Sequence, residues 1–252
     1  TDLQKIIGLI PIDAMLLPDQ IMQVSSFLVS CRRMKAYLKR AEPTGIAIAF
    51  YGGSINDLGE LEEEIERCIR NDLVDDKASA RLETIRRQII ITTDQIKAKL
   101  ESLLRKNKDW FSEGFVSIRN GRYTLPVKRQ HKNKVVGSVI DQSHTGGTCF
   151  IEPASVGKLQ AELATLKIEE DSEVRRILYS LTALIGDYLP MIRLNIEAIE
   201  TLDFLFAKGK LSLTMKASPV GITTEREIWL INARHPLLDP DTAIPLNFKG
   251  GP

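Results

Sequence analysis

The sequence is poor in cysteine and histidine, with three residues of each among 252. The cysteines, Cys31, Cys68 and Cys149, lie far apart, which excludes a CxxC zinc site and a disulfide framework and suits a reducing compartment. The histidines do not have zinc-ligand spacing either. We therefore expect neither a metal site nor a disulfide.

Long apolar runs are also missing from the sequence. No stretch approaches the ~18 apolar residues of a membrane span, and the N-terminus lacks the basic and apolar regions of a signal peptide. Hydrophobic residues make up 43% of the chain and charged residues 27%, a composition typical of a folded protein with ample core. These features predict a cytoplasmic protein that makes no membrane contact.

The phosphate-binding motif GxxxxGK[ST] does not occur in the sequence. Gly157-Lys158 and Gly209-Lys210 both lack the earlier glycine and the following Ser or Thr. We therefore expect no bound cofactor, and no enzyme activity from this chain by itself.

Acidic residues are absent from residues 114–140, although the net charge of the whole chain is only +1. This segment is rich in basic side chains, which neutralise phosphates and bind a nucleic-acid backbone without reading its sequence. Aromatic residues are few, so base stacking is poorly supported. The alternative is a solvated face whose lysines discourage strand pairing. The candidate nucleic-acid-binding residues are Arg119, Arg122, Lys128, Arg129, Lys132 and Lys134.

Hydrophobic periodicity predicts long helices on both sides of the basic segment. One helix of about thirty residues follows a cap at Asp75 or Asp76. Another starts after Pro153 and runs to about Tyr188, where Pro190 ends or kinks it. The predicted fold is therefore mainly α, with long antiparallel helices that carry a small β module at their tip.

Between these helices the hydrophobic period changes to two, which is the repeat of a β-strand. Asn120-Gly121 is typical of a type I′ hairpin turn and precedes a predicted strand at 122–129. Pro126 has no backbone donor, so we expect this strand at a sheet edge or beside a bulge. Further strands are predicted at 135–141 and 148–151.

Two further groups of polar residues have less specific patterns. Ser143, His144 and Cys149 lie close together in sequence, which suggests a nucleophile, but triads are built from separated segments. A hydrolase built on these three residues is therefore the least favoured interpretation. The acidic clusters at 62–64 and 169–171 are expected on exposed helix faces.

Several motifs follow one another along the chain, at positions 75–79 with 82 and 85–86, 118–128, 137, 141–143, 146 or 147, 148, 150–153, 169–170 with 176–178, 202–204 with 207–208, and 233–238. Their order resembles that of the bacterial MutS paralogues of the "MutS-two" subfamily. The resemblance covers most of the chain and is most specific in its middle third. It departs at Ile140, where the family usually has His, and at Cys149, where a plain hydrophobe is usual.

The resemblance implies a fragment of a longer protein. It implies core and ascending lever helices at 1–112, a β-rich basic clamp at 113–152, descending lever and core helices at 153–215, and strands leading toward an absent ATPase domain at 216–252. The longer protein is expected to bind ATP and Mg, to form a homodimer, and usually to carry a C-terminal Smr nuclease domain.

Members of this family are associated with branched recombination intermediates, suppression of recombination and stalled ribosomes. The resemblance therefore implies branched or duplex DNA, or ribosomal RNA, as partner, and a place at the nucleoid or the ribosome. The residues themselves support a clamp that holds a nucleic-acid backbone. The alternative is a helical scaffold for dimerisation or protein partners, which the heptad-like apolar stripes at 78–103 and 159–184 favour.

Overall fold

The computed structural model describes residues 2–12, 14–239 and 241–251. Contacts divide the chain into two compact units. The first unit comprises Thr1–Ala36 with Asp57–Ile192, and the second comprises Tyr37–Asn56 with Arg193–Pro252. The protein is mainly α-helical with small antiparallel sheets, which confirms the predicted class at this level.

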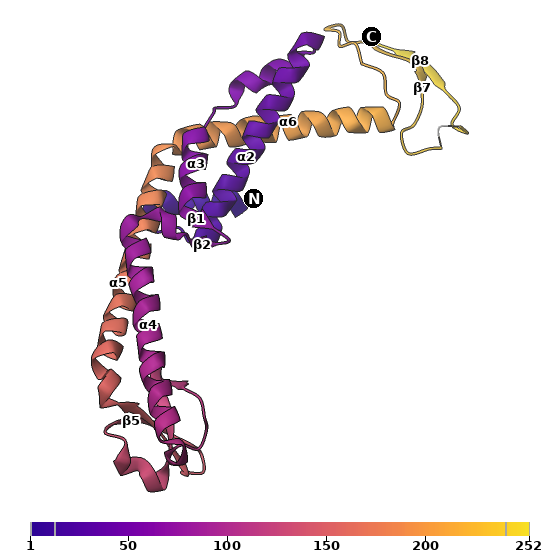
Figure 1. Cartoon of the computed structure of the whole chain (residues 1–252). Coiled ribbons are helices and arrows are strands. Elements are labelled where there is room, and N and C mark those ends of the chain that lie inside the picture. Colours follow the sequence, from indigo (N-terminus) through magenta and orange to yellow (C-terminus); the bar gives the residue numbers. More distant parts are fainter. Residues whose placement is uncertain (1, 13, 240, 252) are drawn as a thin grey trace. The chain divides into compact units, whose positions relative to one another are not determined.

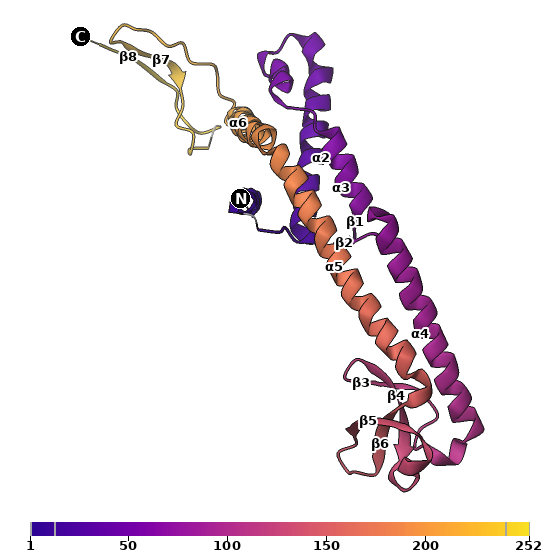
Figure 2. The same ribbon diagram turned by 90° about the vertical axis from the view of Figure 1, so that its left-hand side faces the viewer.

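Two long helices of the first unit, α4 (Ala80–Lys106) and α5 (Gly157–Asp187), lie side by side and antiparallel (Figures 1 and 2). At 1.5 Å per residue, their 27 and 31 residues span roughly 40 and 46 Å. The apolar stripes of both helices are largely buried, so they serve the packing of this pair. The buried positions include Leu82, Ile85, Ile96 and Leu100 of α4, and Leu163, Leu166, Ile177 and Leu181 of α5.

The cap of α4 differs from the predicted one. Ser79 is the N-cap, and its hydroxyl accepts a hydrogen bond from the Leu82 amide at 3.0 Å. Asp75, a predicted cap, instead accepts a hydrogen bond from the Lys77 amide and starts the short 3-10 helix Asp76–Ala78. Each side chain accepts a hydrogen bond from an amide in the first turn of a helix, which has no partner within that helix. Asp75 caps the 3-10 helix, and Ser79 caps α4.

We call the end of the α4–α5 pair near Ser79 the root, and the opposite end the tip. At the root, Glu173 of α5 is only 2% exposed, and its carboxylate accepts hydrogen bonds from Ser79 at 2.7 Å and Arg176 at 2.6 Å. Arg86 of α4 pairs with Glu170 of α5 at 2.8 Å. Glu170, predicted on an exposed face, is thus half-buried because an arginine of the neighbouring helix binds it.

Shorter elements complete the first unit. In one of them, the acidic cluster at 62–64 also differs from the exposed face that the sequence predicts. Glu62 is 6% exposed, and Arg32 of the neighbouring helix binds it at 2.8 Å, so the cluster at 62–64 is not a simple exposed face. A buried carboxylate requires such a partner. These elements are α1 (Asp2–Leu9), α2 (Pro18–Ala41), α3 (Gly59–Cys68), β1 (Ile69–Arg70) and β2 (Leu73–Val74). Of α2, only the part up to Ala36 belongs to the first unit.

The tip carries a four-stranded antiparallel module between α4 and α5 (Figure 2). Its strands have the order β3-β4-β6-β5. Asn120 and Gly121 have φ angles of 48° and 73°, which confirms the type I′ turn between β3 and β4. The strands are β3 (Ser117–Arg119), β4 (Arg122–Lys128), β5 (Gly137–Gln142) and β6 (Thr148–Pro153).

The core of the module joins its sheet to the ends of the two long helices. Leu125 and Val127 of β4 and Ile151 of β6 are at most 1% exposed. They cluster with Leu100 of α4 and Leu163 of α5. The sheet therefore shares one hydrophobic core with the helix ends, which fixes the position of the basic residues on the module.

The expectation that Pro126 places β4 at a sheet edge or beside a bulge is wrong, because β4 is an inner strand and pairs with β6 without a register shift at Pro126. β4 lies inside the sheet, with its first half paired to β3 and its second half to β6. The Pro126 carbonyl accepts a hydrogen bond from the Ser112 amide at 2.9 Å, on the side away from β6. Because a strand residue directs its N–H and C=O to the same side, the missing donor of Pro126 faces the irregular segment near Ser112. The β4–β6 ladder loses no hydrogen bond.

The second unit contains most of α6 (Leu189–Thr214) and the hairpin of β7 (Ile228–Ala233) and β8 (Leu246–Gly250). α5 ends at Asp187 and Pro190 lies in the first turn of α6, as predicted. Asn195 is fully buried, and its amide exchanges hydrogen bonds with the backbone of Asn56 at 2.7 and 3.1 Å. Among the described residues, no single helix has the length and apolar composition of a membrane span, although 154–187 and 189–214 meet these criteria as a bent pair.

Candidate nucleic-acid interface

The structure places the six candidate basic residues in two groups at opposite ends of β4. Arg119 and Arg122 flank the turn that starts this strand. Lys128 ends the strand, and the following 3-10 helix Arg129–Lys134 carries the other three. The side chains of the two groups have different partners.

The arginines of the first group are bound to carboxylates of the module. Arg122 pairs with Glu152 of β6 at 2.7 Å, and the Glu152 side chain is only 8% exposed. Arg119 lies 3.7 Å from the carboxylate of Asp141 in β5, and its guanidinium is 4.2 Å from the centre of the Phe150 ring. Arg119 thereby connects β3 with β5, the two outer strands of the sheet.

A hydrogen bond strengthens this connection between the outer strands. The register of β5 against β6 shifts between Val139 and Asp141, which makes Ile140 the bulged residue. The side-chain amide of Asn120 lies 3.5 Å from the Ile140 carbonyl, at the limit of a hydrogen bond. Arg119 and Arg122 therefore hold the module in shape, and part of their charge is already neutralised.

The second group has no such neutralisation. In the part of the chain that the structure describes, Lys128, Arg129, Lys132 and Lys134 have no carboxylate within 4.0 Å. Lys128 donates a hydrogen bond to the Asp109 carbonyl at 3.1 Å, and Lys134 lies 5.5 Å from the centre of the Trp110 ring. Both contacts position the ammonium groups without cancelling their charge. We call Lys128, Arg129, Lys132 and Lys134 the basic tip group.

A shallow groove runs beside this group. Lys128, Arg129, Gln130 and Gly147 line it. The Arg129 amide donates to the Gly147 carbonyl at 2.9 Å, which joins the 3-10 helix to the loop before β6. A Cβ atom at Gly146 would lie 3.3 Å from the Arg129 guanidinium, and its φ of 69° also favours glycine. The loop therefore packs closely against Arg129 and leaves an open basic surface.

The structure adds basic residues that the sequence argument missed. Arg105 and Lys106 end α4, and Lys108 begins the next 3-10 helix, one residue before the carbonyl that Lys128 binds. Cations in the last turn of a helix, such as Arg105 and Lys106, also interact favourably with the helix dipole, so the sequence gives no separate reason to assign them to an interface. The bond from Lys128 shows that the two segments meet. Asp109 and Glu113 are the acidic residues of the same region.

The structure does not assemble the suggested nucleophile. Cys149 is 3% exposed and belongs to the core of the module, whereas His144 is exposed. The Ser143 hydroxyl accepts a hydrogen bond from the Thr148 amide at 3.0 Å and so stabilises its own loop. A hydrolase built on these residues is therefore not supported.

The remaining cysteines are buried and free. Burial raises the pKa of the Cys31 thiol to about 12 and that of the Cys68 thiol to about 11, so neither is a thiolate near neutral pH. Within residues 2–12, 14–239 and 241–251, no group of three or more His, Cys, Asp or Glu side chains could hold a metal ion.

The chain is similar in sequence to proteins named Endonuclease MutS2. It is 37% identical to that of Alkaliphilus oremlandii over 233 residues, which cover 90% of this chain and 30% of the relative. It is 34% identical to the protein of Alkaliphilus metalliredigens over 253 residues, or 98% of this chain and 32% of the relative. The Bacillus cereus protein is 33% identical over 257 residues, which cover the whole chain and 33% of the relative.

No protein-family model matches the chain. The chain spans about a third of the length of the curated relatives that it matches. These relatives agree in name and align with nearly all of its residues. By this similarity the chain corresponds to a fragment of a MutS2-like protein.

Proposed function

We propose that this chain is the nucleic-acid-gripping part of a longer MutS2-type protein. The observation that carries the proposal is the basic tip group, four cationic side chains that lie at the end of a pair of long helices and have no carboxylate partner among the described residues. Such a surface binds phosphates and releases counterions, independently of sequence. In this proposal α4 and α5 are the levers of a MutS-like arrangement, and the β module is its clamp.

The wider role belongs to the longer protein. There, an ATPase domain with ATP and Mg would change the geometry of a homodimer and move the levers as rigid bodies. The relatives are named endonucleases, so a nuclease domain belongs to the same proposal. The partner is branched or duplex DNA or ribosomal RNA, with a role in suppressing recombination or in ribosome rescue at the nucleoid or the ribosome.

The alternative, a helical scaffold for dimerisation or protein partners, loses its main support. The apolar stripes that favoured it are largely buried within the first unit, where α4 packs against α5. A stripe that is already used in this way does not provide a dimer interface. We therefore keep nucleic-acid binding as the proposed function.

The test is a fluorescence anisotropy titration of a labelled four-way junction, duplex and single strand with the chain, at low and near-physiological salt. Four phosphate contacts predict a slope of log K against log salt of about −3 to −4 on duplex. Charge reversal of the whole basic tip group (K128E, R129E, K132E and K134E together) should remove this binding at low salt.

A matched control distinguishes the effect of the local charge at the tip on affinity from the effect of the net charge of the chain. Arg33, Lys39, Lys77 and Lys167 are exposed, lie on elements outside the β module and have no carboxylate within 4.0 Å among the described residues. Their reversal to Glu changes the net charge equally and should leave most of the affinity. Equal losses in both quadruple variants, or no binding by the unmodified chain, would refute the proposed interface.

A further inference from the structure

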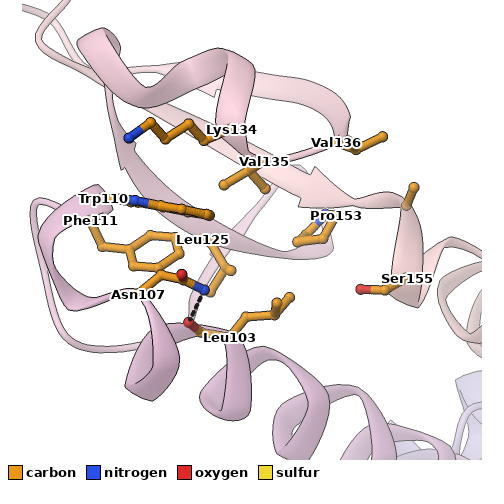
Figure 3. A pocket seen from close by; sticks show the side chains of 11 residues that line it. Leu103, Asn107, Trp110, Phe111, Leu125, Lys134, Val135, Val136, Pro153 and Ser155 are labelled. Carbon is orange, nitrogen blue, oxygen red and sulfur yellow. Dashed lines mark hydrogen bonds between the residues drawn. The ribbon is translucent and has the colours of Figure 1, made fainter.

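An apolar pocket of about 210 Å³ lies in the module, where the segment after α4 meets the segments before β5 and after β6. Trp110, Phe111, Leu125, Val135 and Pro153 form much of its wall. Figure 3 shows Lys134 and Val135 above the Trp110 ring in this view, and Phe111 and Leu125 below it. Sites for drug-sized ligands have roughly 300–1,000 Å³, so this pocket suits a single flat ring system rather than a whole cofactor.

A few polar groups line this apolar wall. The Lys134 ammonium lies 5.5 Å from the centre of the Trp110 ring. The Asn107 side chain donates its amide nitrogen to the Leu103 carbonyl at 3.4 Å, which leaves its oxygen available as an acceptor. Ser155 contributes an exposed hydroxyl. Apolar walls with a few polar groups are the usual composition of sites that bind and orient a small ring.

Lys134 connects this pocket to the basic tip group, because it belongs to both. A phosphate held by Lys134 would bring its own nucleoside to the pocket. Base contact with aromatic side chains tolerates any sequence, because every base has a π face. An apolar peptide side chain would contact the apolar wall but not the Lys134 ammonium. A nucleotide would contact both, through its base and its phosphate.

We propose that this pocket takes one nucleobase of the strand whose phosphates the basic tip group holds. This inference rests on the proposed function and adds a base contact to it. The sequence alone argued against such a contact, because aromatic residues are sparse around the basic segment. The fold changes that argument by bringing Trp110, which follows α4, to Lys134, which precedes β5.

The first test uses Trp110 as its own reporter. The chain has two tryptophans, so Trp229→Phe leaves Trp110 as the single emitter. This variant is titrated with a single-stranded oligonucleotide and with an all-abasic strand of equal length and phosphate number. We expect the base-bearing strand to change the Trp110 emission and to bind roughly 5- to 100-fold more tightly than the abasic strand.

The outcomes separate this inference from the proposed function. If both strands bind equally and the Trp110 emission stays constant, the base contact is refuted while backbone binding stands. If neither strand binds at low salt, the proposed function is refuted, and so is the inference that rests on it. A free nucleoside monophosphate should not change the emission at concentrations where the strand saturates. If it binds as tightly as the strand, the pocket is a site for free nucleotide and the inference is overturned.

The second test fills the pocket and leaves the charges unchanged. Ser155 is exposed at the pocket, so Ser155→Phe places a ring there with little demand on the core. This variant should lose the preference for the base-bearing strand and bind the abasic strand as before, which also reports that the module is folded. Ser138→Phe puts the same ring on an exposed position of β5 outside the pocket lining and should retain the preference. A full preference in Ser155→Phe would overturn the inference.

Discussion

The root and the tip of the α4–α5 pair are both rich in charge, but their charged residues have different partners. At the root, Arg86 and Arg176 bind carboxylates at 2.8 and 2.6 Å, and Glu173 is almost completely buried. At the tip, the basic tip group has no carboxylate within 4.0 Å among the described residues. Positive charge at the root is therefore paired with carboxylates, between α4 and α5 for Arg86 and within α5 for Arg176, whereas positive charge at the tip is available to a ligand.

The comparison also holds within the module itself. Arg119 and Arg122 lie close to the basic tip group in sequence, yet they are bound to Asp141 and Glu152 as the root arginines are bound to their partners. The partner of each cation therefore decides whether its charge is already neutralised within the module. Sequence position does not decide this. The comparison predicts that stability and nucleic-acid affinity respond to different sets of residues.

The largest effect should come from Gly137, because the module depends on close backbone packing. A Cβ atom at this position would lie 2.0 Å from the Glu152 carbonyl oxygen and 2.8 Å from the Pro153 Cα, and neither can move without breaking the β5–β6 pairing. Gly137→Ala should lower the free energy of unfolding by about 3 kcal/mol or more, at the upper end of overpacking effects. Denaturant unfolding measures this loss.

The control for this change is Gly114→Ala in the same region. No heavy atom lies within 4 Å of a Cβ atom built at Gly114. This variant should stay within about 0.5 kcal/mol of the unmodified chain, as expected for a surface substitution. Similar stability of the two variants would show that β5 can shift away from β6, and that the module is less tightly packed than the structure indicates.

Glu173 should have the next largest effect, at the root. Its carboxylate accepts hydrogen bonds from Ser79 and Arg176, and Gln would keep the shape but lose the charge. We expect Glu173→Gln to reduce the free energy of unfolding by about 1.5–3 kcal/mol, the range for hydrogen bonds to charged groups. Nucleic-acid affinity should be unchanged. Glu162→Gln, an exposed position of α5, is the matched control and should change neither quantity.

The same carboxylate should make stability depend on pH in a defined window. Its hydrogen bond with Arg176 lowers the pKa of Glu173 from 4.5 to about 2. Because the folded state holds the ionised form, this contribution is complete above pH 4.5 and is lost as the pH falls toward about 2. The stability difference between the unmodified chain and Glu173→Gln should therefore shrink across that window in denaturant titrations. A constant difference would mean that Glu173 stabilises by shape alone.

Local features of this fold were predictable from sequence, and partners distant in sequence were not. Asn120-Gly121 specified its turn because two adjacent residues with positive φ determine a type I′ hairpin. By contrast, Arg122 could not be separated from Lys132, because Glu152 becomes the partner of Arg122 only when β4 and β6 pair. The prediction of the position of β4 from Pro126 failed for the same reason, because tertiary structure determines which neighbour the backbone nitrogen of Pro126 faces.

A pair of substitutions in the module tests the division between its two groups of cations. Arg122→Met leaves the buried Glu152 carboxylate unpaired and should cost about 1–2 kcal/mol of stability, with little change in the salt dependence of binding. Lys132→Met should leave stability within about 0.5 kcal/mol but reduce the salt slope of binding by about 1. The reverse pattern in unfolding and anisotropy titrations would mean that the partners in the structure do not decide the role of a cation.

The smallest change in stability should come from Arg81 at the root. This residue tests whether an arginine near a carboxylate stabilises the fold without donating hydrogen bonds to it. Arg81 and Arg176 both approach Glu173, and both are exposed, with side-chain exposures of 66% and 61%. Arg81 stays 4.0 Å from the carboxylate, whereas Arg176 donates two hydrogen bonds of 2.6 and 3.0 Å. We expect Arg81→Met to cost less than about 0.5 kcal/mol, as weak surface pairs do. Arg176→Met should lower the free energy of unfolding clearly more than Arg81→Met, because it removes the hydrogen bonds of a buried carboxylate. Equal losses in denaturant unfolding would mean that the root responds to the total charge around Glu173 rather than to the geometry of each contact.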